Sequence, residues 1–330
     1  MSEMVLVTGS TGFIGTRLLH FLSVEGTKVR ALLRPESDGS SLPCGVDVVR
    51  AGFENREALG RVVQGVDRIV HLAGVTKARD DDAFDAGNVM PVRNLLFAVS
   101  RHNPGLKRFL LVSSLAAAGP AREGVFGVLE SDEPRPVSAY GRSKLRAEQL
   151  CMRECGAVPF TIVRPPVVYG PGDRDVLQVF RMFTKGVLVS VGKDRKQRCS
   201  IIFVDDLVRG IMAAARSDRA AAQIYYLSSP DSCSWEEFAA ASRPVLGFGS
   251  LRSIRLPDAL VILLGAVGGV VGRLSGKPPL INRDKVNELV QDYWVCSARK
   301  AAKELGFIAG TPLVEGVAET VAWYRMKGWL

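Results

Sequence analysis

Two hydrophobic patterns alternate along the first half of the chain, and together they predict its secondary structure. Short apolar runs predict strands at residues 4–7, 28–34, 46–49, 67–74, 108–114 and 160–164. Stretches with apolar residues at helical spacing predict helices at residues 16–25, 55–64, 88–102 and 138–155. This alternation is typical of an α/β fold with a doubly wound, Rossmann-type parallel sheet.

The alternation fades after Gly170, where element lengths become uneven. We therefore place a nucleotide-binding domain at residues 1–170 and a smaller, mainly substrate-binding domain at 171–330. Residues 200–225 are expected to return to the first domain. At 330 residues, the chain is long enough for two domains.

One long apolar stretch, residues 256–274, lies in the second half of the chain. It is interrupted by Asp258 and several glycines, and it is shorter than the ~20 apolar residues that a spanning helix needs. No firm membrane span is predicted. The pattern favours a helix buried in the second domain. Contact with a membrane surface and the lining of an apolar substrate pocket are the alternatives.

A glycine-rich turn follows the first predicted strand and precedes the first predicted helix. Gly9 permits the tight turn, Gly12 lets the backbone approach a pyrophosphate, and Gly15 lets the helix pack close to the strand. The free N–H groups of the helix N-terminus favour phosphate. The expected cofactor contacts in this turn are Gly9, Thr11, Gly12, Phe13, Ile14 and Gly15.

Ligands of open α/β sheets bind at the carboxyl ends of the strands. This rule places the glycine turn, Arg34, Ala73-Gly74 and Ser113-Ser114 along one edge of the predicted sheet. His71, close to that edge, is interpreted as a packing residue or a residue beside the cofactor rather than a base.

Tyr140 and Lys144 are four residues apart and therefore share one face of a predicted helix. An ammonium group near a phenol lowers the phenol pKa, so that Tyr140 could exchange a proton with a carbonyl or an alcohol. Ser114 could hydrogen-bond the same oxygen. A Tyr–Lys pair alone is most often a surface pair, but the preceding glycine turn and serine-bearing strand end favour a catalytic site.

Composition and charge narrow the class of protein. The hydrophobic fraction is 47% and the charged fraction 23%, as in ordinary globular proteins, and 43 basic against 34 acidic residues give a net charge of +9. The richest basic run, residues 193–198, includes an acid and is predicted to be a solvated loop. No nucleic-acid motif is present.

The cysteines and the N-terminus give expectations about compartment and metals. The six cysteines are scattered without accompanying histidines, which predicts reduced thiols and no metal site. The chain runs directly from its first residues into a strand, so no signal peptide is expected and a cytoplasmic location is predicted.

These motifs together resemble the extended short-chain dehydrogenase/reductase family, which includes the epimerase/dehydratase enzymes. The apolar second domain adds some similarity to the 3β-hydroxysteroid dehydrogenase and dihydroflavonol reductase branches. The resemblance rests on Thr8-Gly9-x-x-Gly12-x-x-Gly15, His71-Leu72-Ala73-Gly74, Tyr140-x-x-x-Lys144, Arg164-Pro165-Pro166 and Phe203-Val204-Asp205-Asp206.

The resemblance implies roles for individual residues. Tyr140 would be the catalytic acid or base. Lys144 would hold the nicotinamide ribose and adjust the pKa of Tyr140, and Ser114 would be the third residue of the catalytic set. Asn88 begins a predicted helix, where capping is one explanation and a cofactor contact the other. The remaining cofactor contacts implied by the resemblance are Leu72, Ala73, Gly74, Pro165 and Val167. A homodimer through the helices near residues 98–102 and 143–152 is also implied.

Two departures from the family pattern affect the expected chemistry. NAD users in this family resemble one another in carrying an acid at the end of the second strand, where this chain has Leu33 followed by Arg34. A guanidinium can bind a 2′-phosphate, so NADP is favoured and NAD remains possible. Arg30 is a weaker second candidate. The residues after Ser114, 115–118, contain no acid, which disfavours dehydratase chemistry and predicts an apolar site.

We therefore predict an NADP(H)-dependent oxidoreductase that interconverts a secondary alcohol and a ketone on a bulky, apolar small molecule. A nucleotide-sugar epimerase with retained NAD is the first alternative. It would need a basic patch for a diphosphate, for which Arg181, Lys185 and Arg198 are candidates. A non-catalytic NADP-binding subunit or sensor is the second alternative, and a complete Ser, Tyr and Lys set argues against it.

Overall fold

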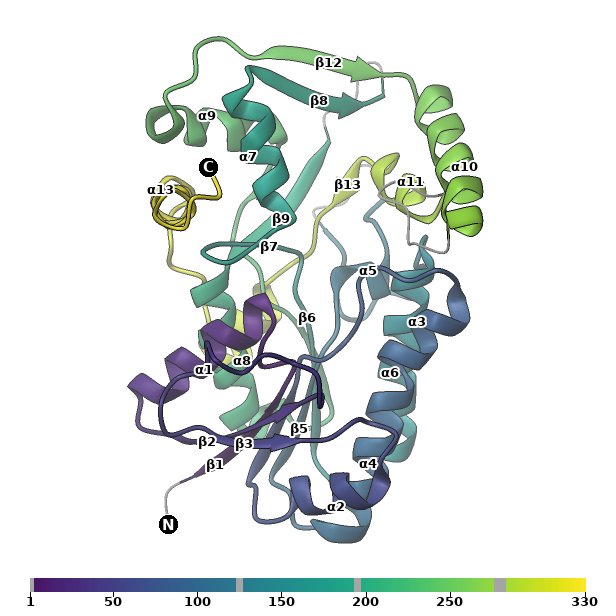
Figure 1. Cartoon of the computed structure of the whole chain (residues 1–330), viewed down its shortest axis with the longest axis vertical. Helices are drawn as coiled ribbons and strands as arrows, with labels where there is room; N and C mark the ends of the chain where they lie inside the picture. The colour runs from purple at the N-terminus through teal and green to yellow at the C-terminus, as the bar shows by residue number, and fades with distance from the viewer. Residues whose placement is uncertain (1–2, 123–126, 193–196, 276–282) are drawn as a thin grey trace.

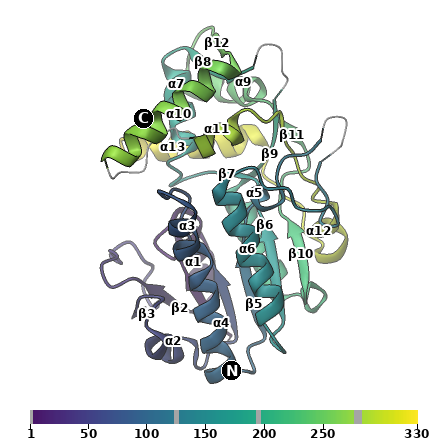
Figure 2. The same ribbon diagram turned by 90° about the vertical axis from the view of Figure 1, so that its right-hand side faces the viewer.

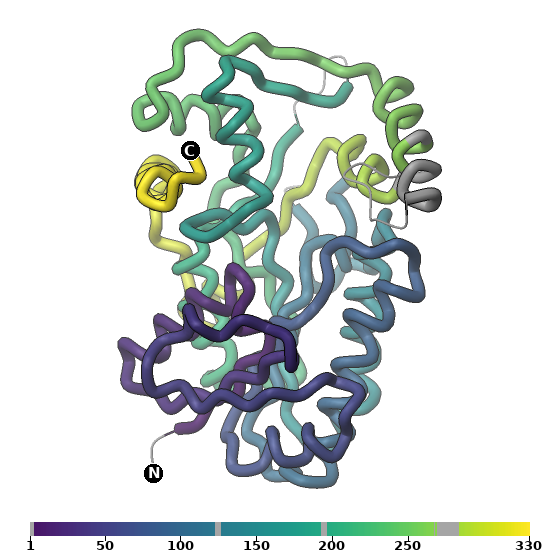
Figure 3. Tube along the Cα trace, in the orientation of Figure 1, coloured from purple at the N-terminus to yellow at the C-terminus, as the bar shows by residue number. Residues whose placement is uncertain are grey.

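The computed structural model describes residues 3–122, 127–192, 197–275 and 283–330. The grey segments in Figure 3 mark the remainder and part of one helix. Most of the basic run at 193–198 lies outside the described residues.

A seven-stranded parallel sheet forms the lower half of the molecule (Figure 1). Its strand order is β10-β6-β5-β4-β1-β2-β3. The order reverses between β1 and β4, which confirms the predicted doubly wound Rossmann-type sheet. The strands are β1 Met4–Thr8, β2 Lys28–Leu33, β3 Asp47–Arg50, β4 Arg68–His71, β5 Arg108–Val112, β6 Phe160–Arg164 and β10 Gln223–Tyr226.

Helices cover both faces of this sheet (Figure 2). Alternate residues of β1 enter different cores: Leu6 packs on one face, and Val5 and Val7 on the other. The face of Val5 and Val7 is covered by α1 Phe13–Val24 and α8 Val204–Arg216. The face of Leu6 is covered by α2 Arg56–Val63, α4 Met90–His102 and α6 Ala139–Glu154.

The helix predicted over 88–102 differs from the structure. It begins at Met90, and a separate helix, α3 Asp81–Asn88, precedes it. Asp80 caps α3 by accepting a hydrogen bond from the Ala83 N–H. Pro91 lies in the first turn of α4, where its missing N–H costs nothing. Asn88 therefore ends a helix rather than beginning one, and the capping interpretation was wrong.

The second lobe lies above the carboxyl edge of the large sheet (Figure 1). Its aromatic core includes Tyr169, Phe180, Phe183, Phe238 and Tyr324. Its strands are β7 Val167–Tyr169, β8 Val187–Val191, β9 Arg198–Phe203, β11 Ser232–Cys233, β12 Arg252–Leu256 and β13 Tyr293–Trp294. Its helices include α7 Val176–Thr184, α9 Trp235–Leu246, α11 Arg283–Leu289 and α13 Leu313–Met326. Residues 204–226 return to the large sheet, because α8 packs on it and β10 pairs with β6.

The long apolar stretch forms α10 Asp258–Ser275, and the prediction that this helix is buried was wrong. Val261 is buried, but Leu263 is 59% exposed and Ile262 is 54% exposed. The helix lies at the outer margin of the second lobe (Figure 1), where Val261 packs with Val191 and Val286. Among the helices of the described residues, none is long and apolar enough to cross a membrane.

Candidate active site

The glycine turn closes against the neighbouring strand end, with little room for side chains. Gly9 has a φ of +70°, which glycine adopts readily, and a Cβ there would lie 2.7 Å from the Ala73 backbone nitrogen. A Cβ at Gly15 would lie 2.1 Å from the Gly9 carbonyl oxygen. Thr11 and Gly12 are exposed at the start of α1, with Phe13 and Ile14 partly buried behind them. This exposed backbone at a helix N-terminus fits a dinucleotide pyrophosphate.

His71 and Thr8 lie beneath the turn, at the ends of β4 and β1. Thr8 Oγ1 is 2.8 Å from His71 Nδ1 and accepts a hydrogen bond from the Ala73 N–H, which orients residues 72–74. Burial, with a smaller contribution from the Lys144 ammonium, lowers the pKa of His71 to about 3. His71 is therefore neutral at physiological pH and packs between Phe53 and Phe109. The role of Thr8 was not predicted.

Asn88 connects the loop after β4 to the helix that carries Tyr140. Its Oδ1 accepts a hydrogen bond from the Val75 N–H at 2.8 Å, and its Nδ2 donates to Ser143 Oγ at 2.8 Å. A Cβ on Gly74 would lie 2.7 Å from the same Oδ1. Asn88 thus positions the loop of Leu72, Ala73 and Gly74 against α6. Its direct contact with a cofactor stays a prediction.

Ser114 and Tyr140 meet above the end of β5. Ser114 caps the short helix α5 Leu115–Ala118 by accepting a hydrogen bond from the Ala116 N–H, and its hydroxyl lies near enough to Tyr140 to lower the pKa of that phenol. Ser138 caps α6 in the same way and so fixes the turn that carries Tyr140. The structure therefore brings together two of the three predicted catalytic residues.

The pKa of Tyr140 differs from the value expected from the sequence. This pKa is raised to about 12, mainly by burial and further by the carboxylates of Glu288 and Asp175, while the nearby Ser114 hydroxyl acts to lower it. The predicted lowering by Lys144 is not seen. Tyr140 consequently keeps its proton at neutral pH.

Lys144 explains part of this difference, because its ammonium group lies elsewhere. Lys144 Nζ donates a hydrogen bond to the carbonyl oxygen of Val112 at 2.7 Å. Burial lowers the pKa of Lys144 to about 8, while Glu148 opposes the shift. A Cβ on Gly74 would lie 3.9 Å from Nζ, so the ammonium adjoins the loop that follows β4. That position suits contact with a cofactor ribose at this edge.

The residues that directly follow Ser114 are apolar, and the predicted apolar character of the site stays a prediction. Leu115 and Ala116–Ala118 are all buried. The Pro165 carbonyl oxygen accepts a hydrogen bond from the Leu115 N–H at 2.9 Å, which connects α5 to the chain after β6. Pro165 is buried, and Val167 begins β7 two residues later, partly exposed. The predicted contacts of Pro165 and Val167 with a nicotinamide stay predictions.

Arg34 directly follows β2, at the carboxyl edge of the large sheet and on the side away from β6. Its side chain is 69% exposed and forms a loose ion pair with Glu36, in which Nε lies 3.7 Å from Oε1. Arg50, at the end of β3, donates to the carbonyl oxygens of Ser37 and Pro35 and so shapes the loop after Arg34. Sequence reasoning missed Arg50, although its place at a strand end beside β2 was a usable signal.

Arg30 does not fit its suggested role as a second phosphate ligand. Its Nε donates to Asp47 at 2.7 Å, and its Nη1 donates to the backbone carbonyls of Val62 and Gln64. These contacts hold the guanidinium between β3 and the end of α2. The weaker candidate for phosphate binding is therefore already engaged in the structure.

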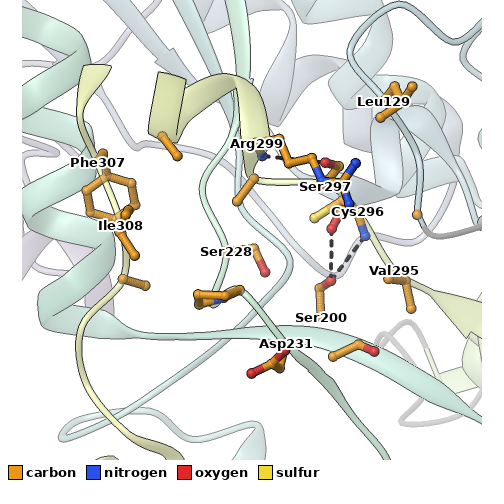
Figure 4. Close-up of a pocket in the computed structure, with 16 residues that line it drawn as sticks. Leu129, Ser200, Ser228, Asp231, Val295, Cys296, Ser297, Arg299, Phe307 and Ile308 are labelled. Carbon is orange, nitrogen blue, oxygen red and sulfur yellow. Dashed lines mark hydrogen bonds between the residues drawn. The ribbon is translucent and has the colours of Figure 1, made fainter. Parts of the chain in front are cut away.

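A separate cavity of about 450 Å³ lies beside β9, near α12 Arg299–Leu305 (Figure 4). Its lining includes Ser200, Ser228, Cys296, Arg299, Phe307 and Ile308, and none of the predicted catalytic residues. Ser200 Oγ already exchanges hydrogen bonds with the backbone of Cys296. We assign no ligand to this cavity.

Strand order, glycine turn and the tyrosine-bearing helix define the class of Rossmann-type, nucleotide-binding enzymes. Residues 5–227 match the family described as NAD dependent epimerase/dehydratase. The chain belongs to this family and is an NAD(P)-dependent enzyme of the extended short-chain dehydrogenase/reductase type, which confirms the resemblance.

Relatives cover nearly the whole chain. The ceramide reductase of Caulobacter vibrioides is 30% identical over 328 residues, covering 99% of this chain and 96% of the relative. A putative dihydroflavonol 4-reductase of Synechocystis is 26% identical, and the match covers 100% of this chain and 97% of the relative. Among solved structures, the crystal structure of gox2253 superposes with a TM-score of 0.82 at 25% identity, covering 100% of both chains.

Proposed function

We propose that this protein is an NADP(H)-dependent reductase that converts a ketone on a bulky, apolar molecule into a secondary alcohol. The observation that carries the proposal is that the Ser114 and Tyr140 side chains lie close together at the carboxyl end of β5, with Tyr140 on the helix that also carries the buried Lys144. A non-catalytic binder of NADP has no need of this pair beside a buried lysine.

The residues support the following chemistry. The bound cofactor supplies hydride to the carbonyl carbon. The Ser114 hydroxyl donates a hydrogen bond to the carbonyl oxygen, and Tyr140 gives that oxygen its phenolic proton. The raised pKa of Tyr140 suits this direction, because the phenol stays protonated at neutral pH. Lys144, whose ammonium adjoins Gly74, would hold the cofactor ribose.

Arg34 supports NADP over NAD. Leu33 is buried and offers no acceptor for ribose hydroxyls, whereas the exposed Arg34 guanidinium has room to turn toward a 2′-phosphate. Arg50 adds a second positive charge at the same strand ends. The family description names NAD, so this preference is our own proposal.

The substrate class is inferred from the apolar residues after Ser114 and from the relatives. Buried Leu115 and Ala116–Ala118 follow Ser114 directly and offer no charge to a sugar or a phosphate. The ceramide reductase of C. vibrioides is similar to this chain over almost its full length. We therefore favour a long-chain lipid ketone, and a keto precursor of a ceramide is the first compound to test.

A nucleotide-sugar epimerase is the second candidate, because the matching family includes epimerases. Two of the three basic residues that it would need already have partners. Arg198 binds the carboxylate of Glu237 and the hydroxyl of Ser232, and Arg181 donates to the Trp329 carbonyl oxygen. The diphosphate patch required for this activity therefore has less support than the ketone site.

The deciding experiment is an analysis of nucleotide in the purified, dialysed protein, followed by turnover assays. We expect an empty protein that binds NADPH more tightly than NADH and oxidises it when a long-chain ketone is added in detergent micelles. Retained NAD, together with interconversion of a UDP-sugar and no ketone reduction, would instead establish the epimerase.

We also propose a homodimer through α4 and α6, acting in the cytoplasm. These helices lie side by side on one face of the sheet, and both carry exposed apolar side chains. Phe97 on α4 is 40% exposed, and Met152 on α6 is 43% exposed. Light scattering of the purified protein tests the dimer, and a Phe97→Asp variant is expected to shift it to monomer.

A further inference from the structure

Helix α10 presents an apolar face to the outside of the molecule. Leu260, Ile262, Leu263 and Leu264 are between 42% and 59% exposed. Val261 and Gly265, four residues apart, are the buried positions on the inward face. Figure 1 shows α10 at the outer margin of the second lobe, with β12 leading into it.

A helix on the surface of a water-soluble domain normally carries polar residues on its outward face. Residues 259–272 contain no charged side chain and no side chain that hydrogen-bonds. In contrast, α2 carries Arg56, Glu57 and Arg61 on its exposed surface. The outward face of α10 therefore has the composition of a surface that contacts an apolar phase.

Positive charge flanks this apolar face. Arg252 and Arg255 are exposed on β12, the strand that precedes α10. Asp258, in the first turn of α10, is the acidic residue in this part of the chain and is only partly exposed. The whole chain carries a net charge of +9. This combination of apolar residues and basic neighbours fits an anionic lipid surface.

The apolar face also adjoins the candidate active site. Inward-facing Val261 of α10 packs in one cluster with Val286 of α11. On α11, Asp284 accepts hydrogen bonds from the backbone N–H groups of Ala139 and Tyr140. The exposed face is thus separated from the start of the tyrosine-bearing helix by a single helix. A molecule that partitions into a bilayer would have a short route to the site.

We propose that the outward face of α10 docks on an anionic lipid bilayer, with the helix lying in the plane of the interface. The helix is about 27 Å long at the usual rise per residue, and no helix of the described residues qualifies as a span. Its apolar side chains would enter the boundary between headgroups and acyl chains, while Arg252 and Arg255 contact anionic headgroups. This docking surface does not depend on the identity of the substrate.

Sedimentation with lipid vesicles tests the proposal. The full-length protein is mixed with vesicles of phosphatidylglycerol and phosphatidylcholine, or of phosphatidylcholine alone. We expect binding to the anionic vesicles that weakens with salt, because screening reduces the electrostatic part. A variant with Leu260→Ser, Leu263→Ser and Leu264→Ser should bind at least tenfold more weakly. Arg252→Gln should weaken binding to the anionic vesicles alone.

Matched controls separate docking from general loss of surface hydrophobicity or folding. Val24 and Val314 are 77% and 53% exposed, and neither lies on α10. Their replacement by serine should leave vesicle binding unchanged. The thermal unfolding midpoint of the α10 variant should stay close to that of the wild type, because the three leucines are between 42% and 59% exposed.

Three outcomes would overturn the proposal. The first is wild-type protein that stays in the supernatant with both kinds of vesicle. The second is an α10 variant that binds as well as the wild type. The third is a wild-type oligomer that the α10 variant converts to monomer without any vesicle binding, which would assign this face to a second copy of the chain.

Discussion

Both carboxylate oxygens of Glu148 accept hydrogen bonds from the guanidinium of Arg164, Oε1 at 3.0 Å and Oε2 at 2.6 Å. Neither side chain is more than 1% exposed. Arg164 also donates to the hydroxyl of Tyr226. Although burial acts to lower the pKa of Arg164, its partner Glu148 raises it above the usual value. The pair connects α6, which carries Tyr140 and Lys144, to the end of β6.

Removing one partner of this pair is expected to destabilise the fold strongly. Glu148→Ala leaves a buried guanidinium without its counter-ion, and we expect the free energy of unfolding to fall by about 3–5 kcal/mol. Urea denaturation measures this change. Glu57→Ala, which removes an exposed pair with Arg61, should cost about 0.5 kcal/mol or less. Equal effects of the two variants would contradict the interpretation.

Tyr140 is expected to be necessary for turnover and dispensable for cofactor binding. Tyr140→Phe removes the transferable proton and should lower kcat by about 10²–10⁴-fold, with the dissociation constant for NADPH nearly unchanged. Tyr169→Phe, in the aromatic core of the second lobe, is the matched control and should keep its turnover. Full activity of the Tyr140 variant would disprove the proposed proton donor.

The sheet and its glycine turn could be predicted from the sequence because local pattern determines them. The runs at residues 4–7 of β1 and 109–112 of β5 are continuous and apolar, and a Cβ at Gly9 or Gly15 would clash with the backbone. Helix α3 escaped prediction because its sequence is largely polar and has no apolar period. Its formation depends on the Asp80 cap and on burial of Phe84.

Side-chain partners and burial were harder to predict than elements. The Tyr140–Lys144 spacing placed both residues on one helix face, but only the structure shows Lys144 Nζ bound to Val112. Asn88 gave no sign in the sequence of its connection to Ser143. The apolar composition of residues 256–274 indicated a helix. Composition alone does not show which face of that helix packs against the rest of the protein.

Arg34 is expected to discriminate between the two nicotinamide cofactors. A charged hydrogen bond to the 2′-phosphate is worth about 1.5–3 kcal/mol, so Arg34→Ala should weaken NADPH binding about 10- to 100-fold and leave NADH binding unchanged. Fluorescence titration of both cofactors measures the two constants. Arg61→Ala, at another exposed arginine, is the control. Parallel weakening of NADH and NADPH binding would show that Arg34 does not read the phosphate.

His71 is expected to make the fold sensitive to acid. Burial lowers its pKa from 6.5 to about 3 in the folded protein, so below pH 6.5 the unfolded chain binds a proton that the folded chain excludes. The free energy of unfolding should therefore fall as the pH drops from 6.5 toward 3. The loss attributable to His71 amounts to about 2 kcal/mol by pH 5, at 1.36 kcal/mol per pH unit.

Urea denaturation between pH 7 and pH 5 measures the acid sensitivity of His71. Between pH 7 and pH 5, the free energy of unfolding of His71→Leu should fall by about 2 kcal/mol less than that of the wild type. This expectation does not depend on how stable the variant is at pH 7. His20→Leu changes an exposed histidine and should keep the wild-type dependence. The expected difference between the wild type and the His71 variant arises because the folded protein keeps the His71 imidazole neutral between Phe53 and Phe109. If the variant shows the same pH dependence as the wild type, the folded protein must accept a proton at His71.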